Sequence, residues 1–172
     1  MVKDDFYYLE QTPVGLAKDL IAELPLEEGD KLFEPFRGEG AFYNSFPDGF
    51  AKDYAEIEEG RDYATTALSF GRADWVITNP PFRILDAKGK RVNSFFPLLE
   101  HFSKITNKGI AFLANDRCFS TLTPVRLKRI HESGWYIQKI VVCAVKKWRG
   151  RYFWIVFGRT PSTLFKQLDP NY

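Results

Sequence analysis

Short apolar stretches alternate with amphipathic helical patterns along most of this 172-residue chain. Residues 109–114 are wholly apolar, and an apolar run of this length predicts a buried strand. Strands that alternate with helices favour an α/β fold with a mostly parallel sheet. Residues 136–145 and 152–157 are both strand-like and are joined by a short turn, which predicts an antiparallel hairpin. We therefore expect a mostly parallel sheet that ends in an antiparallel C-terminal hairpin.

Weaker signals predict the remaining elements. Thr12-Pro13 has the form of an N-cap followed by a proline at the first helical position. Residues 57–73 are too few for a full helix and a strand, so the crossover there is expected to be trimmed. Residues 83–92 are polar and predict a loop. The other expected elements are strands at 30–36, 50–57 and 74–79, and helices at 41–46, from Ser94 and after Thr123-Pro124.

Length and composition exclude several classes of protein. The chain is long enough for a single domain, which we expect to cover residues 1–172. Hydrophobic residues make up 45%, which argues against disorder, and no apolar run is long enough to span a membrane. Cys118 and Cys143 are too few for a disulfide framework or a zinc site. With no signal-peptide pattern at the N-terminus, we expect a cytoplasmic protein without a metal or a membrane partner.

The net charge of +2 conceals a division along the sequence. Residues 1–82 carry 7 Lys/Arg and 17 Asp/Glu, whereas residues 83–159 carry 16 Lys/Arg and 4 Asp/Glu. A basic half suits a polyanion such as nucleic acid, and an acidic half suits a cationic ligand. The alternative is that folding intermixes these charges on a solvated surface.

A glycine-rich turn follows the first predicted strand. Glu34-Pro35 ends the strand, and Gly38 and Gly40 form the turn into a helix. Glycines let a backbone approach a ligand closely, so the pattern fits a nucleoside-cofactor turn, although strand–glycine–helix turns are common. Glu56, 22 residues after Glu34, is placed to hold a ribose diol or belongs to a solvated acidic run.

Asp62 and Tyr63 form a further polar–aromatic pair. The acid could bind an adenine amine while the ring packs on its plane; the alternative is a turn with a half-buried tyrosine. The strongest signal is Asn79-Pro80-Pro81-Phe82 after an apolar strand. Each proline stiffens the residue before it, so a stiff backbone can aim the Pro80 carbonyl at a ligand beside the Asn79 oxygen. Phe82 offers a flat face, although an ordinary turn with a core phenylalanine has the same sequence.

Asn79-Pro80-Pro81-Phe82 resembles the catalytic motif of S-adenosylmethionine-dependent amino-methyltransferases. Residues 34–40 resemble their cofactor motif, and Gln11-Thr12-Pro13 is similar to their N-terminal cofactor segment. The residues at 56–63 match the pattern of small, phage-type DNA adenine-N6 methyltransferases, and the motif order is the γ arrangement. The specific part of the resemblance is confined to residues 34–42 and 74–82.

The resemblance implies a Rossmann-like class I methyltransferase fold, S-adenosylmethionine as cofactor and adenine in DNA as substrate, with no separate target-recognition domain. It implies that the Asn79 oxygen and the Pro80 carbonyl accept the adenine amino group while Phe82 stacks on the base. The cofactor residues it implies are Thr12 and Pro13 at the methionine carboxylate, Glu34, Pro35, Gly38 and Gly40 along the methionine end, Glu56 at the ribose, and Asp62 and Tyr63 at the adenine.

Two basic segments are candidates for nucleic-acid binding. The first follows Phe82, at the edge of the sheet where an α/β fold binds ligands. The second joins the last two strands, and we expect it at the opposite edge; its tryptophan either stacks on a base or caps the sheet. The candidate residues are Arg83, Lys88, Lys90 and Arg91 in the first segment, and Lys147, Trp148 and Arg149 in the second.

Other functions fit the same motif. A planar amide nitrogen poses the same chemical problem as adenine N6, so the substrate could be adenine in RNA or a protein glutamine. The basic half favours nucleic acid over protein, and we expect DNA rather than RNA. A third reading is a non-catalytic, cofactor-binding subunit, although such subunits often lose the tetrapeptide. A homodimer or a partner subunit could supply target recognition, and the sequence does not identify the recognised bases.

Overall fold

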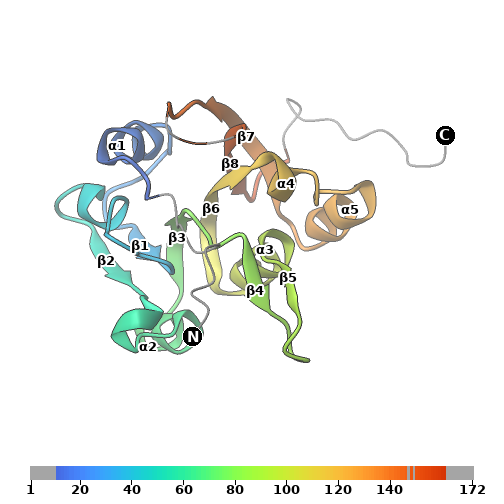
Figure 1. The fold of residues 1–172 in the computed structure, drawn as a ribbon. Coiled ribbons are helices and arrows are strands. Elements are labelled where there is room, and N and C mark those ends of the chain that lie inside the picture. The colour runs from blue at the N-terminus through green and yellow to red at the C-terminus, as the bar shows by residue number, and fades with distance from the viewer. Residues whose placement is uncertain (1–10, 147, 149, 162–172) are drawn as a thin grey trace.

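The computed structural model describes residues 11–146, 148 and 150–161, and six of its strands form one sheet in the order β2-β1-β3-β6-β8-β7 (Figure 1). Strands β1, β2, β3 and β6 run parallel to one another, and β8 runs antiparallel to both β6 and β7. The expected mostly parallel sheet with an antiparallel C-terminal hairpin is confirmed. The strands are β1 Lys31–Glu34, β2 Ala51–Tyr54, β3 Ala73–Thr78, β6 Thr106–Asn115, β7 Tyr136–Cys143 and β8 Tyr152–Gly158.

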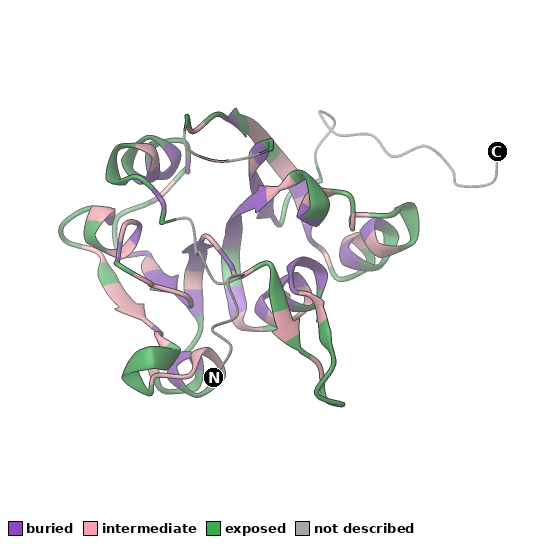
Figure 2. Ribbon diagram, viewed as in Figure 1, coloured by how far each residue is buried: buried purple, intermediate pink, exposed green. Residues whose placement is uncertain are grey.

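Helices cover both faces of the sheet because the strands carry buried apolar side chains on both faces. Buried residues accordingly run along the strands and the helix faces turned towards them (Figure 2). Helix α1 and the 3₁₀ helix η1 cover one face, and α2, α3, α4 and α5 cover the other. Their bounds are α1 Val14–Ala22, η1 Tyr43–Ser45, α2 Tyr63–Phe70, α3 Phe95–Ile105, α4 Asp116–Phe119 and α5 Pro124–Glu132, with a further 3₁₀ helix, η2, at Ile57–Glu59.

The strand order creates a switch point between β1 and β3. From β1 the chain moves outward to β2, and it then returns to the other side of β1 to form β3. In open α/β sheets ligands bind beyond the carboxyl ends of the strands at such a point. The same order places the acidic half of the sequence around β2 and β1, and the basic half around β6, β8 and β7.

The central strands pack closely because one position lacks a side chain. Gly109 on β6 pairs with Trp75 on β3, and the Trp75 ring lies over the glycine. A Cβ atom at Gly109 would lie 2.1 Å from the nearest ring carbon, which is far inside van der Waals contact. The indole therefore occupies the space that any other residue at this position would need.

Residues 83–92, predicted as a loop, form an antiparallel hairpin of β4 Arg83–Leu85 and β5 Arg91–Asn93. Asp86 closes its turn by accepting hydrogen bonds from the backbone N–H groups of Lys88 and Lys90, each at 2.9 Å. Gly89 supplies a left-handed conformation with φ +73°. The loop prediction was wrong because these turn contacts stabilise strands of only three residues each.

The other predictions hold with shifted bounds. Helix α1 begins at Val14 and has Pro13 as its N-cap, so the Thr12 side chain does not cap it as predicted. Residues 41–46 contain only the 3₁₀ turn η1, and the second strand is shorter than residues 50–57. The crossover before β3 is trimmed to the eight residues of α2. Helix α4 has no counterpart among the predicted elements.

Candidate active site

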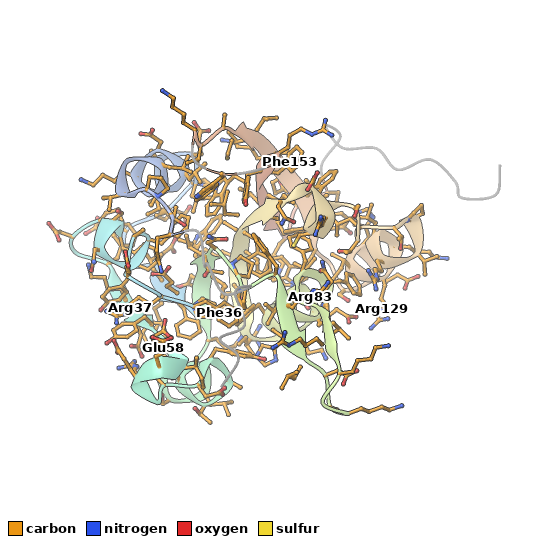
Figure 3. The ribbon with its side chains drawn as sticks, in the orientation of Figure 1. Phe36, Arg37, Glu58, Arg83, Arg129 and Phe153 are labelled. Atoms are coloured by element: carbon orange, nitrogen blue, oxygen red, sulfur yellow. The ribbon has the colours of Figure 1, made fainter. Side chains whose placement is uncertain are left out.

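The glycine turn after β1 and the Asn-Pro-Pro-Phe turn after β3 meet at the switch point, at the carboxyl end of the parallel strands. Both turns begin where a buried strand ends, so their backbones are anchored by the sheet. Figure 3 shows Phe36 and Arg37 on the loop that follows β1, and Arg83 on β4 just after the second turn. The motifs that the sequence analysis singled out are therefore brought together in space.

Glu34 is the last residue of β1, and only 2% of its surface is exposed. Its carboxylate accepts a hydrogen bond from the backbone N–H of Tyr43 at 2.6 Å, which holds η1 against the end of the strand. Burial raises the pKa of Glu34 well above its ordinary value, and the nearby Glu56 acts in the same direction. The Tyr43 hydrogen bond and Arg37 oppose this shift without cancelling it.

Glu56 contacts the glycine turn instead of belonging to a solvated acidic run. One carboxylate oxygen accepts a hydrogen bond from the Gly38 backbone N–H at 2.7 Å, and the other accepts from Glu58 N–H at 3.1 Å. The end of β2 is thereby tied to the turn after β1. A carboxylate retains further lone pairs when each oxygen accepts one bond, so Glu56 keeps acceptor capacity for a hydroxyl donor.

The two glycines of the turn have left-handed backbones, with φ +52° at Gly38 and +86° at Gly40. A Cβ atom at Gly38 would lie 3.2 Å from the side-chain oxygen of Gln11. That oxygen also accepts a long hydrogen bond of 3.4 Å from Glu39 N–H. The segment before α1 therefore lies over the glycine turn, although it is distant in sequence.

Asn79 connects the same N-terminal segment to the second turn. Its side-chain nitrogen donates to the Thr12 hydroxyl at 3.3 Å, so Thr12 contacts the asparagine of the Asn-Pro-Pro-Phe turn rather than capping a helix. The side-chain oxygen of Asn79 is buried and accepts no hydrogen bond from any described residue. A buried acceptor without a donor is costly, so this oxygen is poised to receive an N–H group from a ligand.

Ser94 fixes the backbone of the tetrapeptide. Its hydroxyl donates to the Pro81 carbonyl, and its backbone N–H donates to the Phe82 carbonyl at 3.2 Å. Ser94 and Pro80 are buried, whereas 37% of the Phe82 surface is exposed. In the sequence, Ser94 is predicted only as the start of a helix. A serine before a helical pattern is the expected N-cap signal, and that local reading hides its contact with residues 81 and 82.

Asp62 and Tyr63 begin α2 and serve the fold as well as the site. One oxygen of Asp62 caps the helix by accepting from Ala64 N–H at 2.9 Å and Thr65 N–H at 3.3 Å. The Tyr63 ring lies 5.2 Å from the Phe36 ring and 5.3 Å from the His101 ring. These contacts support the half-buried-tyrosine alternative, yet they also place the pair beside the loop that carries the glycine turn.

His101 packs against Tyr63 and is partly buried, which its position on a predicted helix did not indicate. Burial lowers the pKa of His101, Lys104 lowers it further, and Asp62 opposes the shift. The ring is therefore neutral around pH 7. Its Nε2 atom is buried and has no hydrogen-bond partner among the described residues.

The described residues of both basic segments lie at the carboxyl end of the sheet. The prediction that the segment between β7 and β8 lies at the opposite edge was wrong. Strand β8 runs antiparallel to β6, so its first residue, Tyr152, pairs with Asn115 at the carboxyl end of β6. The Tyr152 ring lies 6.5 Å from Phe82 and 4.4 Å from Trp148. Trp148 is half-buried and packs on the core, whereas Lys147 and Arg149 are outside the described residues.

The sequence matches no protein-family model, and no curated protein matches it either. Solved structures do match. A chain assigned to the class I S-adenosylmethionine-dependent methyltransferases, from Listeria monocytogenes, matches with a TM-score of 0.63 and 11% identity over 89% of this chain and 60% of that chain. The fold is that of the class I methyltransferases.

Two further structures share this methyltransferase fold. The M protein of the type I restriction enzyme EcoKI matches with a TM-score of 0.59 and 13% identity over 91% of this chain and 45% of its own. Magnesium protoporphyrin IX methyltransferase from Synechocystis PCC 6803, solved with bound S-adenosylmethionine, matches with a TM-score of 0.51 and 9% identity over 85% and 77%. The chain thus spans about half to three fifths of the Listeria and EcoKI chains.

Two other kinds of feature are absent from the described part of the chain. It contains no group of three His, Cys, Asp or Glu side chains placed to hold a metal ion, and Cys118 and Cys143 are separate, buried thiols. None of its helices is both long and apolar enough to cross a membrane.

Proposed function

We propose that this protein transfers a methyl group from S-adenosylmethionine to the N6 amino group of adenine in DNA. The observation that carries the proposal is the buried, unpartnered oxygen of Asn79, held at the switch point of a class I methyltransferase fold. The resemblance of its tetrapeptide to amino-methyltransferases, and of the fold to a restriction-enzyme M protein, supports the choice of an amino group on DNA.

We assign the predicted cofactor residues to an elongated, cationic nucleoside. Gly38 and Gly40 give the turn a left-handed backbone, Thr12 and Pro13 precede α1, and Glu34 ends β1 with Pro35 next in the chain. Glu56 would bind the ribose hydroxyls, and Asp62 with Tyr63 would hold the adenine. Bound there, S-adenosylmethionine supplies a sulfonium methyl group that a nitrogen lone pair can displace from sulfur.

The tetrapeptide would prepare the target nitrogen for this displacement. The lone pair of an adenine amino group is delocalised into the ring and is a poor nucleophile. Acceptance of its two N–H groups by the Asn79 oxygen and the Pro80 carbonyl favours a pyramidal nitrogen with its lone pair free. Rate acceleration then comes from orientation and fixed dipoles, and the amine proton leaves to water.

Phe82 and the two basic segments would hold the substrate. A base in a duplex must be extruded to reach such a turn. Phe82 would stack on the extruded base, which contributes about 1–3 kcal/mol in comparable contacts. Arg83, Lys88, Lys90 and Arg91 would bind phosphates around it. A second copy of the chain or a partner subunit would supply any further target recognition.

The test is incubation of the protein with labelled S-adenosylmethionine and DNA, RNA or protein, followed by identification of the modified residue. We expect N6-methyladenine in DNA. Methylation of adenine in RNA or of a protein glutamine would show that DNA is not the substrate. Cofactor binding without methyl transfer to DNA, RNA or protein would indicate a non-catalytic subunit.

Asn79→Ala should abolish methyl transfer while cofactor binding, measured by calorimetry, stays within about twofold. Asn107→Ala is the matched control because Asn107 is an exposed asparagine at the other end of the sheet. Normal methylation by the Asn79 variant would refute the mechanism.

A further inference from the structure

Leu85 is an exposed leucine on the β4–β5 hairpin, which begins directly after the Asn-Pro-Pro-Phe turn. The exposed fraction of Leu85 is 65%, compared with 37% for Phe82 in the turn itself. A single exposed apolar side chain is common on protein surfaces, but this one belongs to a strongly basic segment beside the candidate active site. The methyl-transfer proposal gives Leu85 no role.

The hairpin packs on the protein through one face and leaves the other open. Successive residues of a strand point to opposite faces, so Ile84 lies on one face of β4 while Arg83 and Leu85 lie on the other. Ile84 and its cross-strand partner Val92 are half-buried, and Ile84 packs against the core. Arg83 and Leu85 are exposed. The open face of the hairpin is therefore available to a substrate.

The position of Leu85 is fixed relative to Phe82. At the base of the hairpin, the Ser94 N–H donates to the Phe82 carbonyl at 3.2 Å, and near the tip the Asp86 N–H donates to the Lys90 carbonyl at 2.9 Å. Three residues of fully extended chain span about 10 Å, which sets the separation of Phe82 and Leu85. The hairpin thus holds two exposed apolar side chains about 10 Å apart on one rigid element.

The charge of the hairpin suits a polyanion. Residues 83–93 contain four cations and a single acid, Asp86, whose carboxylate accepts backbone N–H groups in the turn. No described carboxylate forms an ion pair with Arg83, Lys88 or Lys90. Figure 1 shows the hairpin extending outward beside α3, and Figure 3 shows Arg83 at its start. A two-stranded ribbon fits the major groove of DNA, where its cations can bind phosphates.

Extrusion of a base leaves a space in the base stack of the duplex. The neighbouring bases lose their stacking contacts there, and the former partner base is left unpaired. Apolar side chains, leucine among them, enter base steps in many protein–DNA complexes. The major groove is about 8.5 Å deep, so a side chain about 10 Å from a base held on Phe82 is far enough away to reach the stack.

We propose that Leu85 enters the space that the extruded adenine leaves in duplex DNA, while the cations of the hairpin bind the flanking phosphates. This inference rests on the proposed function, because it requires an adenine held on Phe82. Contact with the neighbouring bases removes the leucine from water and replaces part of the lost stacking, so it favours the extruded state. Leu85 is a positioning residue, since it acts on the duplex and not on the reacting atoms.

The test compares Leu85→Ala on two duplexes that differ only in the base opposite the target. In one duplex the adenine that is methylated lies opposite thymine, and in the other it lies opposite a mismatched cytosine. A mismatched base is easier to extrude than a paired one, so it depends less on Leu85. We expect kcat/KM for methyl transfer to fall about tenfold on the paired duplex and less than about threefold on the mismatched duplex.

A second measurement reports extrusion without methyl transfer. With 2-aminopurine in place of the target adenine, binding of the wild-type protein should increase the fluorescence, because the base leaves the stack. Leu85→Ala should reduce this increase at saturating protein. Leu85→Met retains a long apolar side chain and should restore both the fluorescence and the methylation of the paired duplex to within about twofold of the wild type.

Leu68→Ala is the matched control, since Leu68 is a 79% exposed leucine on α2 and should leave both measurements unchanged. Equal losses of kcat/KM on the two duplexes, or no loss on either, would overturn the role of Leu85 while methyl transfer by the wild-type protein remained. Absence of methyl transfer to DNA by the wild-type protein would instead refute the proposed function, and this inference with it.

Discussion

Two buried acids at the two ends of β1 have opposite electrostatic environments. Asp30, just before the strand, and Glu34, its last residue, are each only 2% exposed. Asp30 accepts hydrogen bonds from Glu27 N–H, Trp75 Nε1–H and the Lys108 ammonium, whereas Glu34 accepts one, from Tyr43 N–H. Burial alone would raise the pKa of Asp30, but these partners lower it overall; the pKa of Glu34 is raised.

The difference distinguishes the amino end of the sheet from the carboxyl end, which carries the candidate active site. Around Asp30 the polar groups are matched with partners, and Trp75 fills the space over Gly109. Around Glu34 and Asn79, acceptors are left with few donors or none. Buried acceptors without partners cost stability, and the unpartnered Asn79 oxygen is typical of a site that is completed by a ligand.

Gly109→Ala should give the largest loss of stability at the Asp30 end. The added Cβ would overlap the Trp75 ring, so we expect the free energy of unfolding to fall by about 3 kcal/mol. Urea denaturation measures it. Gly15→Ala in α1 is the control, since open space surrounds Gly15 and the change should stabilise the helix by about 0.5–1 kcal/mol. Equal effects would show that the Trp75 contact is not tight.

Asp30→Asn and Glu34→Gln should change stability at pH 7 in opposite directions. Loss of the charge on Asp30 weakens its hydrogen bonds and should lower the free energy of unfolding by about 2 kcal/mol. Glu34→Gln removes a carboxylate whose ionised form is destabilised by burial, so this substitution should raise the free energy of unfolding. The same substitution should weaken cofactor binding, and a shift of both stabilities in one direction would contradict the comparison.

The pH dependence follows from the same two shifts. The stabilisation from Asp30 is present above the unfolded pKa of 3.8 and disappears as the pH falls through its lower folded value. Glu34 acts oppositely, because above pH 4.5 the unfolded chain releases a proton that the folded chain retains. Glu34→Gln should therefore flatten the decline in stability between pH 4.5 and neutrality, as followed by thermal unfolding.

Ser94→Ala should affect turnover more than folding. Loss of the hydroxyl frees the Pro81 carbonyl and loosens the tetrapeptide, so we expect kcat to fall about tenfold with little change in the KM for cofactor. Ser120→Ala, which removes an exposed hydroxyl on the neighbouring helix turn, is the control. A change in cofactor KM alone would assign Ser94 to the cofactor turn instead.

Lys88→Ala combined with Lys90→Ala should give the smallest effect. Both residues are exposed on the β4–β5 hairpin, and each phosphate contact adds about one to the slope of log affinity against log salt concentration. The slope for DNA binding should therefore fall by about two. Lys18→Ala with Lys128→Ala alters two exposed lysines on α1 and α5, and an equal effect there would indicate non-specific attraction.

The sequence predicted elements whose information is local. Residues 109–114 and 74–79 are strands because their composition permits little else, and the two turns carry their own glycines and prolines. The contacts of Thr12 with Asn79 and of Ser94 with Pro81 join residues distant in sequence. The local pattern predicted Thr12 as a helix cap and Ser94 only as the start of a helix. The edge occupied by the β7–β8 turn depends on strand direction, which no local pattern encodes.

The bond between Thr12 and Asn79 also bears on the order in which the site matures. It spans 67 positions of sequence, and β1, β2 and β3 all lie between the two residues. During synthesis, a chain that has emerged only as far as its glycine turn lacks the acceptor altogether. The candidate active site is therefore complete only when the chain extends past Asn79, and shorter N-terminal fragments lack it.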